Sequence, residues 1–183
     1  MPRFTQSQVW KVYEDNLGSA EKALKRLQVF SGRSPTFTGL TGWVFEQTIQ
    51  YCLRSDLEAR GLSFTIEEQA KLGARGKADL LLGRVAIEVK LSGLFSEAGI
   101  ATYRKYSKLA HKARLDYLYI TGGERYKHYR DGVASAVGPQ NVFFLDTPRE
   151  WNRFVNRVVA LLKPNRRSRP RLGPKKVSGL TTR

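Results

Sequence analysis

The chain has 183 residues, of which 32 are Lys or Arg and 16 are Asp or Glu, so its formal net charge is +16. This length predicts one domain with appendages, and a hydrophobic content of 41% is enough for a core. So large a positive excess indicates a polyanionic partner, with a basic but uninvolved surface as the alternative. A membrane surface is disfavoured because the sequence has no long apolar span and no basic amphipathic helix with a bulky apolar face.

The cysteine content and the first residues narrow the class of protein. Cys52 is the only cysteine, so the chain forms no intrachain disulfide and no cysteine-based zinc site. No signal peptide is visible after Met1, and we expect an intracellular, cytoplasmic location.

The first part of the chain predicts helices. Residues 6–30 predict two helices, the second beginning after Gly18 with Ser19 as its N-cap. These helices are scaffold, a basic arm on nucleic acid or a dimer contact, and the sequence does not separate the three. Residues 31–41 are rich in Ser, Gly, Thr and Pro and predict a loop.

The next predicted helix, residues 42–60 with Thr41 as its N-cap, carries an acid near its start. Glu46 follows Phe45 in a helix that is otherwise largely apolar. An acid so placed either needs a cation or simply faces solvent near the helix N-terminus, where the helix dipole favours it.

Residues 77–90 predict a β-hairpin. Two short apolar strands flank Gly83-Arg84, which we take as the two loop residues. That loop pairs Leu82 with Val85 and sets the register of the whole hairpin.

The same register brings charged residues together. It places Asp79 opposite Glu88, with Cβ atoms about 5 Å apart. Two carboxylates this close repel each other unless a cation lies between them, and a divalent metal ion takes oxygen ligands. Lys90 then stands beside the site and opposite Lys77, which we expect to hold a phosphate. The alternative is a surface hairpin with a salt-bridged acid pair.

Basic residues surround this hairpin in the sequence. A strand over 62–67 and a polar connection over 69–76 precede it. A helix over 96–114 follows, and we expect one stripe of it to pack on the sheet: Phe95, Ala98, Thr102, Tyr106, Leu109 and Ala113. Basic side chains near the presumed site are Lys71, Arg75 and Lys77. The helix carries an acid-free basic stripe, which favours a phosphate-facing surface over a merely solvated one: Arg104, Lys105, Lys108 and Lys112.

The remaining pattern alternates strand and helix. Residues 116–123 predict a strand that follows a helix and therefore runs parallel to the hairpin's second strand. A helix over 124–137 and a buried strand over 141–145 come next. Residues 147–150, Thr-Pro-Arg-Glu, predict an N-cap and capping box for a last helix, and 163–183 predict a flexible basic tail.

Asp79 followed by the triplet Glu88-Val89-Lys90 resembles the signature of the PD-(D/E)XK nuclease superfamily, the fold of restriction endonucleases and archaeal Holliday junction resolvases. The order of helix, three-stranded meander, helix and strand is similar to the αβββαβ core of that family. Glu46 matches the acid of the resolvases' Gly…Glu helix, whereas Ala78 stands where the family has Pro.

The resemblance spans residues 42–145 and implies an α/β fold with a restriction-endonuclease-like core. A central mixed sheet is flanked by helices, with N-terminal helices and a basic C-terminal tail added. It divides the chain into an N-terminal helical extension (1–41), a nuclease domain (42–162) and the tail (163–183).

The implied activity is metal-dependent hydrolysis of phosphodiester bonds in DNA. Asp79, Glu88 and the backbone carbonyl of Val89 would hold Mg²⁺ or Mn²⁺, and Glu46 would bind a second metal ion directly or through water. Lys90 would orient the attacking water or stabilise the charge of the phosphorane.

The substrate follows from size, layout and charge. Basic helices and a basic tail favour DNA structure over DNA sequence, so we expect a homodimeric endonuclease of the Holliday junction resolvase type, acting in DNA recombination or repair. The alternatives are a site-specific homing or restriction endonuclease, and a non-catalytic nucleic-acid-binding protein that retains the nuclease fold.

Overall fold

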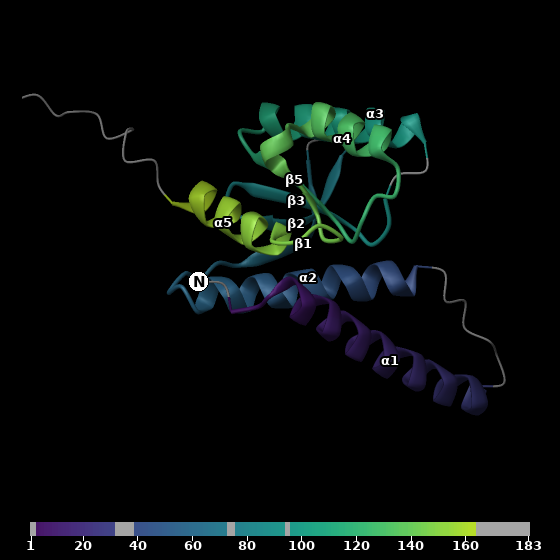
Figure 1. Ribbon diagram of the computed structural model, residues 1–183. Helices are drawn as coiled ribbons and strands as arrows, with labels where there is room; N and C mark the ends of the chain where they lie inside the picture. Colours follow the sequence, from purple (N-terminus) through teal and green to yellow (C-terminus); the bar gives the residue numbers. More distant parts are fainter. Residues whose placement is uncertain (1–2, 32–38, 73–75, 94–95, 164–183) are drawn as a thin grey trace, which may run out of the picture.

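The computed structural model describes residues 3–31, 39–72, 76–93 and 96–163, with the side chains of the first helix described as far as Arg26. Its centre is a five-stranded mixed sheet in the order β1-β2-β3-β4-β5, covered on both faces by helices (Figure 1). The elements are α1 (Gln6–Ser31), α2 (Leu40–Glu58), β1 (Ile66–Lys71), β2 (Lys77–Leu82), β3 (Val85–Lys90), α3 (Glu97–Lys112), β4 (Asp116–Thr121), α4 (Lys127–Val137), β5 (Val142–Phe144) and α5 (Glu150–Leu162).

The sheet joins an antiparallel meander to a parallel half. β1, β2 and β3 are antiparallel neighbours, whereas β4 runs parallel to β3 and β5 runs parallel to β4. A parallel neighbour requires a crossover connection, and α3 and α4 supply the two crossovers. The meander and the parallel crossover are as the sequence predicts.

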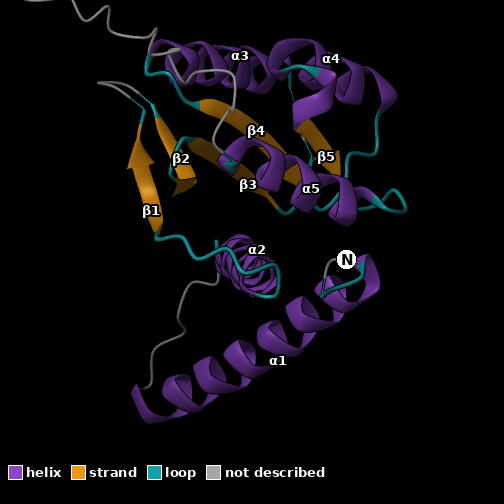
Figure 2. Cartoon of the chain, turned by 90° about the vertical axis from the view of Figure 1, so that its left-hand side faces the viewer, coloured by secondary structure: helices purple, strands orange, loops and turns teal. Residues whose placement is uncertain are grey.

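Helices lie on both faces of the sheet (Figure 2), and a hydrophobic layer holds them on each face. One layer joins α1, α2 and α5 to the first face through residues such as Val9, Phe45 and Trp151. The other joins α3 and α4 to the opposite face around Tyr103 and Tyr119. The alternation of side chains along β3 and β4 therefore assigns each residue to one of the two layers.

The first helix differs from the prediction. α1 is one continuous helix, because Gly18 adopts helical backbone at a modest propensity cost and the Ser19 hydroxyl donates to the Asp15 carbonyl at 2.9 Å. Val9 and Tyr13 are buried in the same core as α2 and α5. The N-terminal segment is therefore packed against the body of the protein.

The first residues of α2 and α5 also differ from the prediction. α2 begins at Leu40 after Gly39, whose φ of 96° favours glycine, so Thr41 is inside the helix. α5 begins only at Glu150 and is preceded by Arg149 in the left-handed region. The expected capping box fails because the Glu150 carboxylate accepts the Phe144 amide at 3.2 Å instead.

The strand before the hairpin lies four residues later than predicted. Residues 62–65 are irregular, and β1 covers most of the segment expected to be a polar connection. β1 is an edge strand whose residues are mostly exposed, with only Ala70 fully buried. Polar residues suit an exposed edge strand, so hydrophobic alternation cannot identify it.

The stripe of α3 that packs on the sheet is also different. Its buried residues are Ile100, Tyr103 and Ala110, whereas Ala98 and Thr102 of the predicted stripe are exposed. None of the helices in the described ranges is long and apolar enough to cross a membrane. The expected basic tail after Lys163 lies outside the described residues.

Candidate active site

The candidate site lies at the end of the sheet where β3 finishes. The β2–β3 ladder runs from Leu82–Val85 to Leu80–Ile87, in the register that the Gly83-Arg84 turn predicts. The expected Asp79–Glu88 pairing lies one step beyond it.

At the Asp79–Glu88 step, a side-chain hydrogen bond replaces a backbone hydrogen bond of the ladder. The Val89 amide donates to Asp79 Oδ2 at 2.8 Å, in the place where the next bonded pair of the antiparallel ladder would form. The Asp79 carboxylate is therefore oriented by the backbone of the neighbouring strand.

One ammonium group connects the two acids. Lys90 Nζ lies 2.7 Å from Glu88 Oε1 and 3.3 Å from Asp79 Oδ2. The structure thus brings together three of the four side chains that the sequence predicts for catalysis. The cation that the opposed carboxylates require is, in this structure, the lysine itself.

Burial makes this cluster strongly dependent on a cation. Glu88 is only 5% exposed, and burial followed by the proximity of Asp79 raises its pKa to about 7. Burial lowers the pKa of Lys90, but the charges of Glu88 and Asp79 outweigh this effect and the net pKa is raised. Lys90 is therefore always charged near neutral pH, while Glu88 is within reach of protonation.

Gln69 belongs to the site and was not predicted. It lies on β1 between the pairs Glu68–Leu80 and Ala70–Ala78, directly across from Asp79. Its backbone has φ 51°. Its side-chain nitrogen, Nε2, donates to Asp79 Oδ1 at 3.2 Å and to Glu46 Oε1 at 3.3 Å. Only a correct placement of β1 would have revealed it.

Glu46 is connected to the acid pair through this glutamine. Burial, and then the charge of Asp79, raise the pKa of Glu46. Within the described ranges, no three His, Cys, Asp or Glu residues are placed to hold one metal ion together. Glu46 is half-buried and is linked to Asp79 by two hydrogen bonds, both donated by the Gln69 side chain.

Tyrosines form the wall of the site on the α3 side. The Tyr117 hydroxyl lies 3.5 Å from Glu88 Oε2, and the rings of Tyr103 and Tyr119 pack with centroids 4.8 Å apart. Burial raises the pKa of Tyr103 to about 12 and that of Tyr117 well above its usual range. Both hydroxyls therefore stay protonated at neutral pH, and the Tyr117 hydroxyl can donate to Glu88.

The chemistry of these donors fits a hard divalent cation. Asp79 and Glu88 offer carboxylate oxygens, the ligand type that Mg²⁺ and Mn²⁺ take, and Val89 contributes a backbone carbonyl in the same stretch. These two neighbouring carboxylates, both buried, already attract an ammonium group. A divalent ion held by Asp79 and Glu88 would compete with Lys90 for these oxygens.

Exposed basic side chains border the site. The predicted stripe of α3 is exposed and lines a groove of about 370 Å³: Arg104, Lys105, Lys108 and Lys112. Lys71 and Lys77 are exposed and face each other across β1 and β2.

The end of the β1–β2 hairpin packs against α3, because a Cβ added at Gly76 would lie 3.0 Å from Leu109 Cδ1. Arg75 lies outside the described residues.

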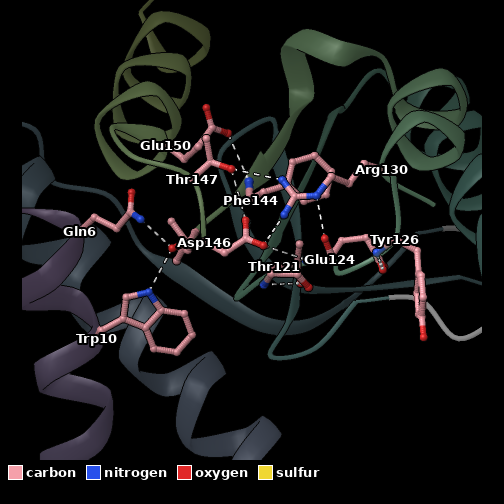
Figure 3. A network of polar contacts seen from close by, with 12 residues as sticks. Gln6, Trp10, Thr121, Glu124, Tyr126, Arg130, Phe144, Asp146, Thr147 and Glu150 are labelled. Atoms are coloured by element: carbon pink, nitrogen blue, oxygen red, sulfur yellow. Dashed lines mark hydrogen bonds and ion pairs between the residues drawn. The ribbon is translucent and has the colours of Figure 1, made fainter. Parts of the chain in front are cut away.

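A second polar network closes the ends of β4 and β5 (Figure 3). Arg130 contacts the Asp146 carboxylate and donates to the Glu124 carbonyl at 2.6 Å. Trp10 Nε1 and the Gln6 amide both donate to the Leu145 carbonyl, at 3.1 and 2.7 Å. This network ties α1 and α4 to the sheet beside a cavity of about 600 Å³ next to the end of β3.

Comparisons of the chain with protein-family models, with curated proteins and with solved structures find no match.

Proposed function

We propose that this protein is a metal-dependent DNA endonuclease of the PD-(D/E)XK type. The observation that carries the proposal is the Lys90 ammonium held between Asp79 and Glu88, at 3.3 and 2.7 Å, on neighbouring strands of a protein with a net charge of +16. Opposed carboxylates with a lysine beside them suit a site that must bind a cation and stabilise a developing negative charge.

The arrangement of elements supports the same proposal. α2, the meander of β1, β2 and β3, then α3 and β4 follow the order helix, three strands, helix, strand that the sequence resemblance implies. Asp79 and Glu88 fall on adjacent strands of the meander, and Glu46 lies on the preceding helix. We therefore propose a restriction-endonuclease-like core.

The roles of the residues follow from their contacts. Asp79 and Glu88 would hold Mg²⁺ or Mn²⁺ with the Val89 carbonyl, and Glu46 would act through Gln69 or a water molecule. When bound, the metal ion supplies charge neutralisation at the phosphate and lowers the pKa of a water molecule. Lys90 remains charged and stabilises the negative charge of the phosphorane.

The substrate we propose is DNA recognised by its shape, such as a four-way junction cut by a homodimer. The basic stripe of α3, together with Lys71 and Lys77, is suited to phosphate contacts, which position a protein on DNA without reading its sequence.

The test is to incubate the protein with a four-way junction, a linear duplex and a single strand, each with Mg²⁺ and with EDTA. We expect Mg²⁺-dependent cleavage that is strongest on the junction. Cleavage at one site of a linear duplex would favour a restriction or homing endonuclease, and binding without any cleavage would contradict the proposal.

A further inference from the structure

An indole group stands exposed one helical turn from the candidate active site. Trp43 is 57% exposed, whereas Trp151 is completely buried. Among the described residues, the ring contacts of α2 involve Phe45 and Tyr51, and Trp43 takes part in none of them. Tryptophan is enriched at interfaces because its ring offers a large apolar surface and its N–H a polar one, so an exposed indole beside a candidate site is suited to a partner.

The position of Trp43 connects it with the site. Trp43 and Glu46 are three residues apart on α2, so their Cβ atoms lie about 5–6 Å apart on one face of the helix. Glu46 is joined to Asp79 through Gln69. Figure 1 shows the N-terminal end of α2 at the same end of the molecule as the N-terminal end of α3, which follows β3.

Two glycines lie close to Trp43 at the start of α2. Among the described residues, a Cβ added at Gly39, just before the helix, or at Gly42, in its first turn, would meet no atom within 4 Å. No described side chain therefore covers the helix backbone at these two positions.

The charge of the molecule identifies the kind of planar group. With 32 basic and 16 acidic residues, the protein attracts nucleic acid, and every nucleobase presents a π-face to an aromatic side chain. A base inside an intact duplex is stacked on both faces and is not accessible to the indole. Only an unpaired or unstacked base can bind there.

We propose that Trp43 binds an unstacked nucleobase next to the phosphate that is cleaved. This inference rests on the proposed nuclease function and narrows its substrate class to DNA with unpaired bases at the cleavage point, such as a fork, a flap or an open junction. Trp43 is a specificity-determining residue in this account, and it takes no part in the chemistry.

The test compares three variants in a binding assay with EDTA, in which no metal-dependent cleavage occurs. We would measure affinity for a twelve-residue oligodeoxythymidine and for a blunt duplex with Trp43→Ala, Trp43→Phe and Tyr51→Ala. Tyr51 is the matched control because it is 53% exposed on the same helix and packs against Phe4. Stacking on one base is worth about 1–3 kcal/mol, so Trp43→Ala should weaken single-strand binding about 5- to 150-fold.

All three variants should bind the duplex with wild-type affinity. On the single strand, Trp43→Phe should bind almost as tightly as wild type and Tyr51→Ala equally tightly. Equal loss on duplex and single strand, or no loss at all, would overturn the inference. So would a loss that follows dissociation of a dimer in sedimentation velocity, because the indole would then be a contact between two copies. Trp43-dependent binding in a protein that cleaves nothing with Mg²⁺ would refute the nuclease function alone.

Discussion

At the scale of single residues, the site is defined by the contacts of four charged side chains with one another and with two amide groups. Lys90 neutralises Asp79 and Glu88, the Val89 amide orients Asp79, and Gln69 links Asp79 to Glu46. Each carboxylate is thus positioned before any substrate or metal ion arrives. This is the arrangement that preorganised electrostatic stabilisation requires.

The raised pKa of Glu88 predicts a pH dependence of stability. The ordinary value is 4.5 and the folded value is about 7, so between these pH values the folded protein retains a proton that the unfolded chain has lost. The free energy of unfolding should therefore fall by about 3 kcal/mol as the pH rises from about 4.5 to about 7 without metal, and level off above that. Urea titrations at pH 4.5, 6 and 8 measure this fall.

The matched variant is Glu88→Gln, which keeps the hydrogen-bonding shape of the side chain and has no carboxyl to titrate. Its stability should change less over the same range. If wild type and variant lose stability in parallel between pH 4.5 and 8, Glu88 is not the group responsible.

Removing the amide of Gln69 should damage the site without damaging the fold. In Gln69→Ala, Asp79 and Glu46 lose their shared donor and repel each other more strongly. We expect cleavage with Mg²⁺ to slow by about 10- to 100-fold, because a misplaced ligand costs rate steeply. Single-turnover kinetics on labelled DNA gives the rate.

Gln47→Ala is the control for this variant, since Gln47 bonds to Glu68 at 3.4 Å on the exposed side of α2. It should cleave like wild type. A Gln69→Ala protein with full activity would show that Glu46 and Asp79 act independently.

At the scale of elements, the hydrophobic pattern predicted the buried strands of the sheet. It failed for the exposed edge strand. β2, β3, β4 and β5 are buried and were predicted within a few residues, and the turn at Gly83-Arg84 set the hairpin register correctly. β1 was misplaced because an exposed edge strand carries no apolar alternation, and so Gln69 was not predicted. Tyr117 was missed because its contact with Glu88 spans two strands that are distant in sequence.

The continuity of α1 predicts opposite effects for two glycine substitutions. In the part of the chain that the structure describes, no atom lies within 4 Å of a Cβ added at Gly18 or Gly61, but Gly61 has φ 70° and Gly18 is helical. Gly18→Ala should stabilise the protein by about 1 kcal/mol, and Gly61→Ala should destabilise it by about 1–2 kcal/mol. Urea unfolding of the two variants measures both effects, and loss of stability in Gly18→Ala would indicate that the helix breaks there.

At the scale of the whole molecule, one basic surface lies along α3, on the face of the sheet that α3 and α4 cover. The groove along α3 is lined by basic side chains, and the end of the β1–β2 hairpin packs against the same helix. Glu88 lies on this side too, next to Tyr117. A phosphate backbone that follows α3 would therefore pass close to the acid pair.

This distribution predicts how salt affects DNA binding. Each phosphate contact contributes about 0.9 to the slope of log K against log salt for duplex DNA. A double variant, Lys105→Gln with Lys108→Gln, should lower the slope by about 2, as measured by fluorescence anisotropy at several salt concentrations. Lys22→Gln with Lys25→Gln on α1, across the sheet from α3 (Figure 1), removes the same charge and should lower the slope less. Equal slopes in both double variants would show that binding follows net charge alone.

The measurement that tests the central claim most directly is cleavage by variants of the acid pair. Asp79→Asn and Glu88→Gln should bind a labelled four-way junction at least as tightly as wild type and should not cleave it in the presence of Mg²⁺. Glu67→Gln, an exposed acid of β1 away from the pair, should cleave at the wild-type rate. Full cleavage by Asp79→Asn or by Glu88→Gln would contradict the assignment of this site.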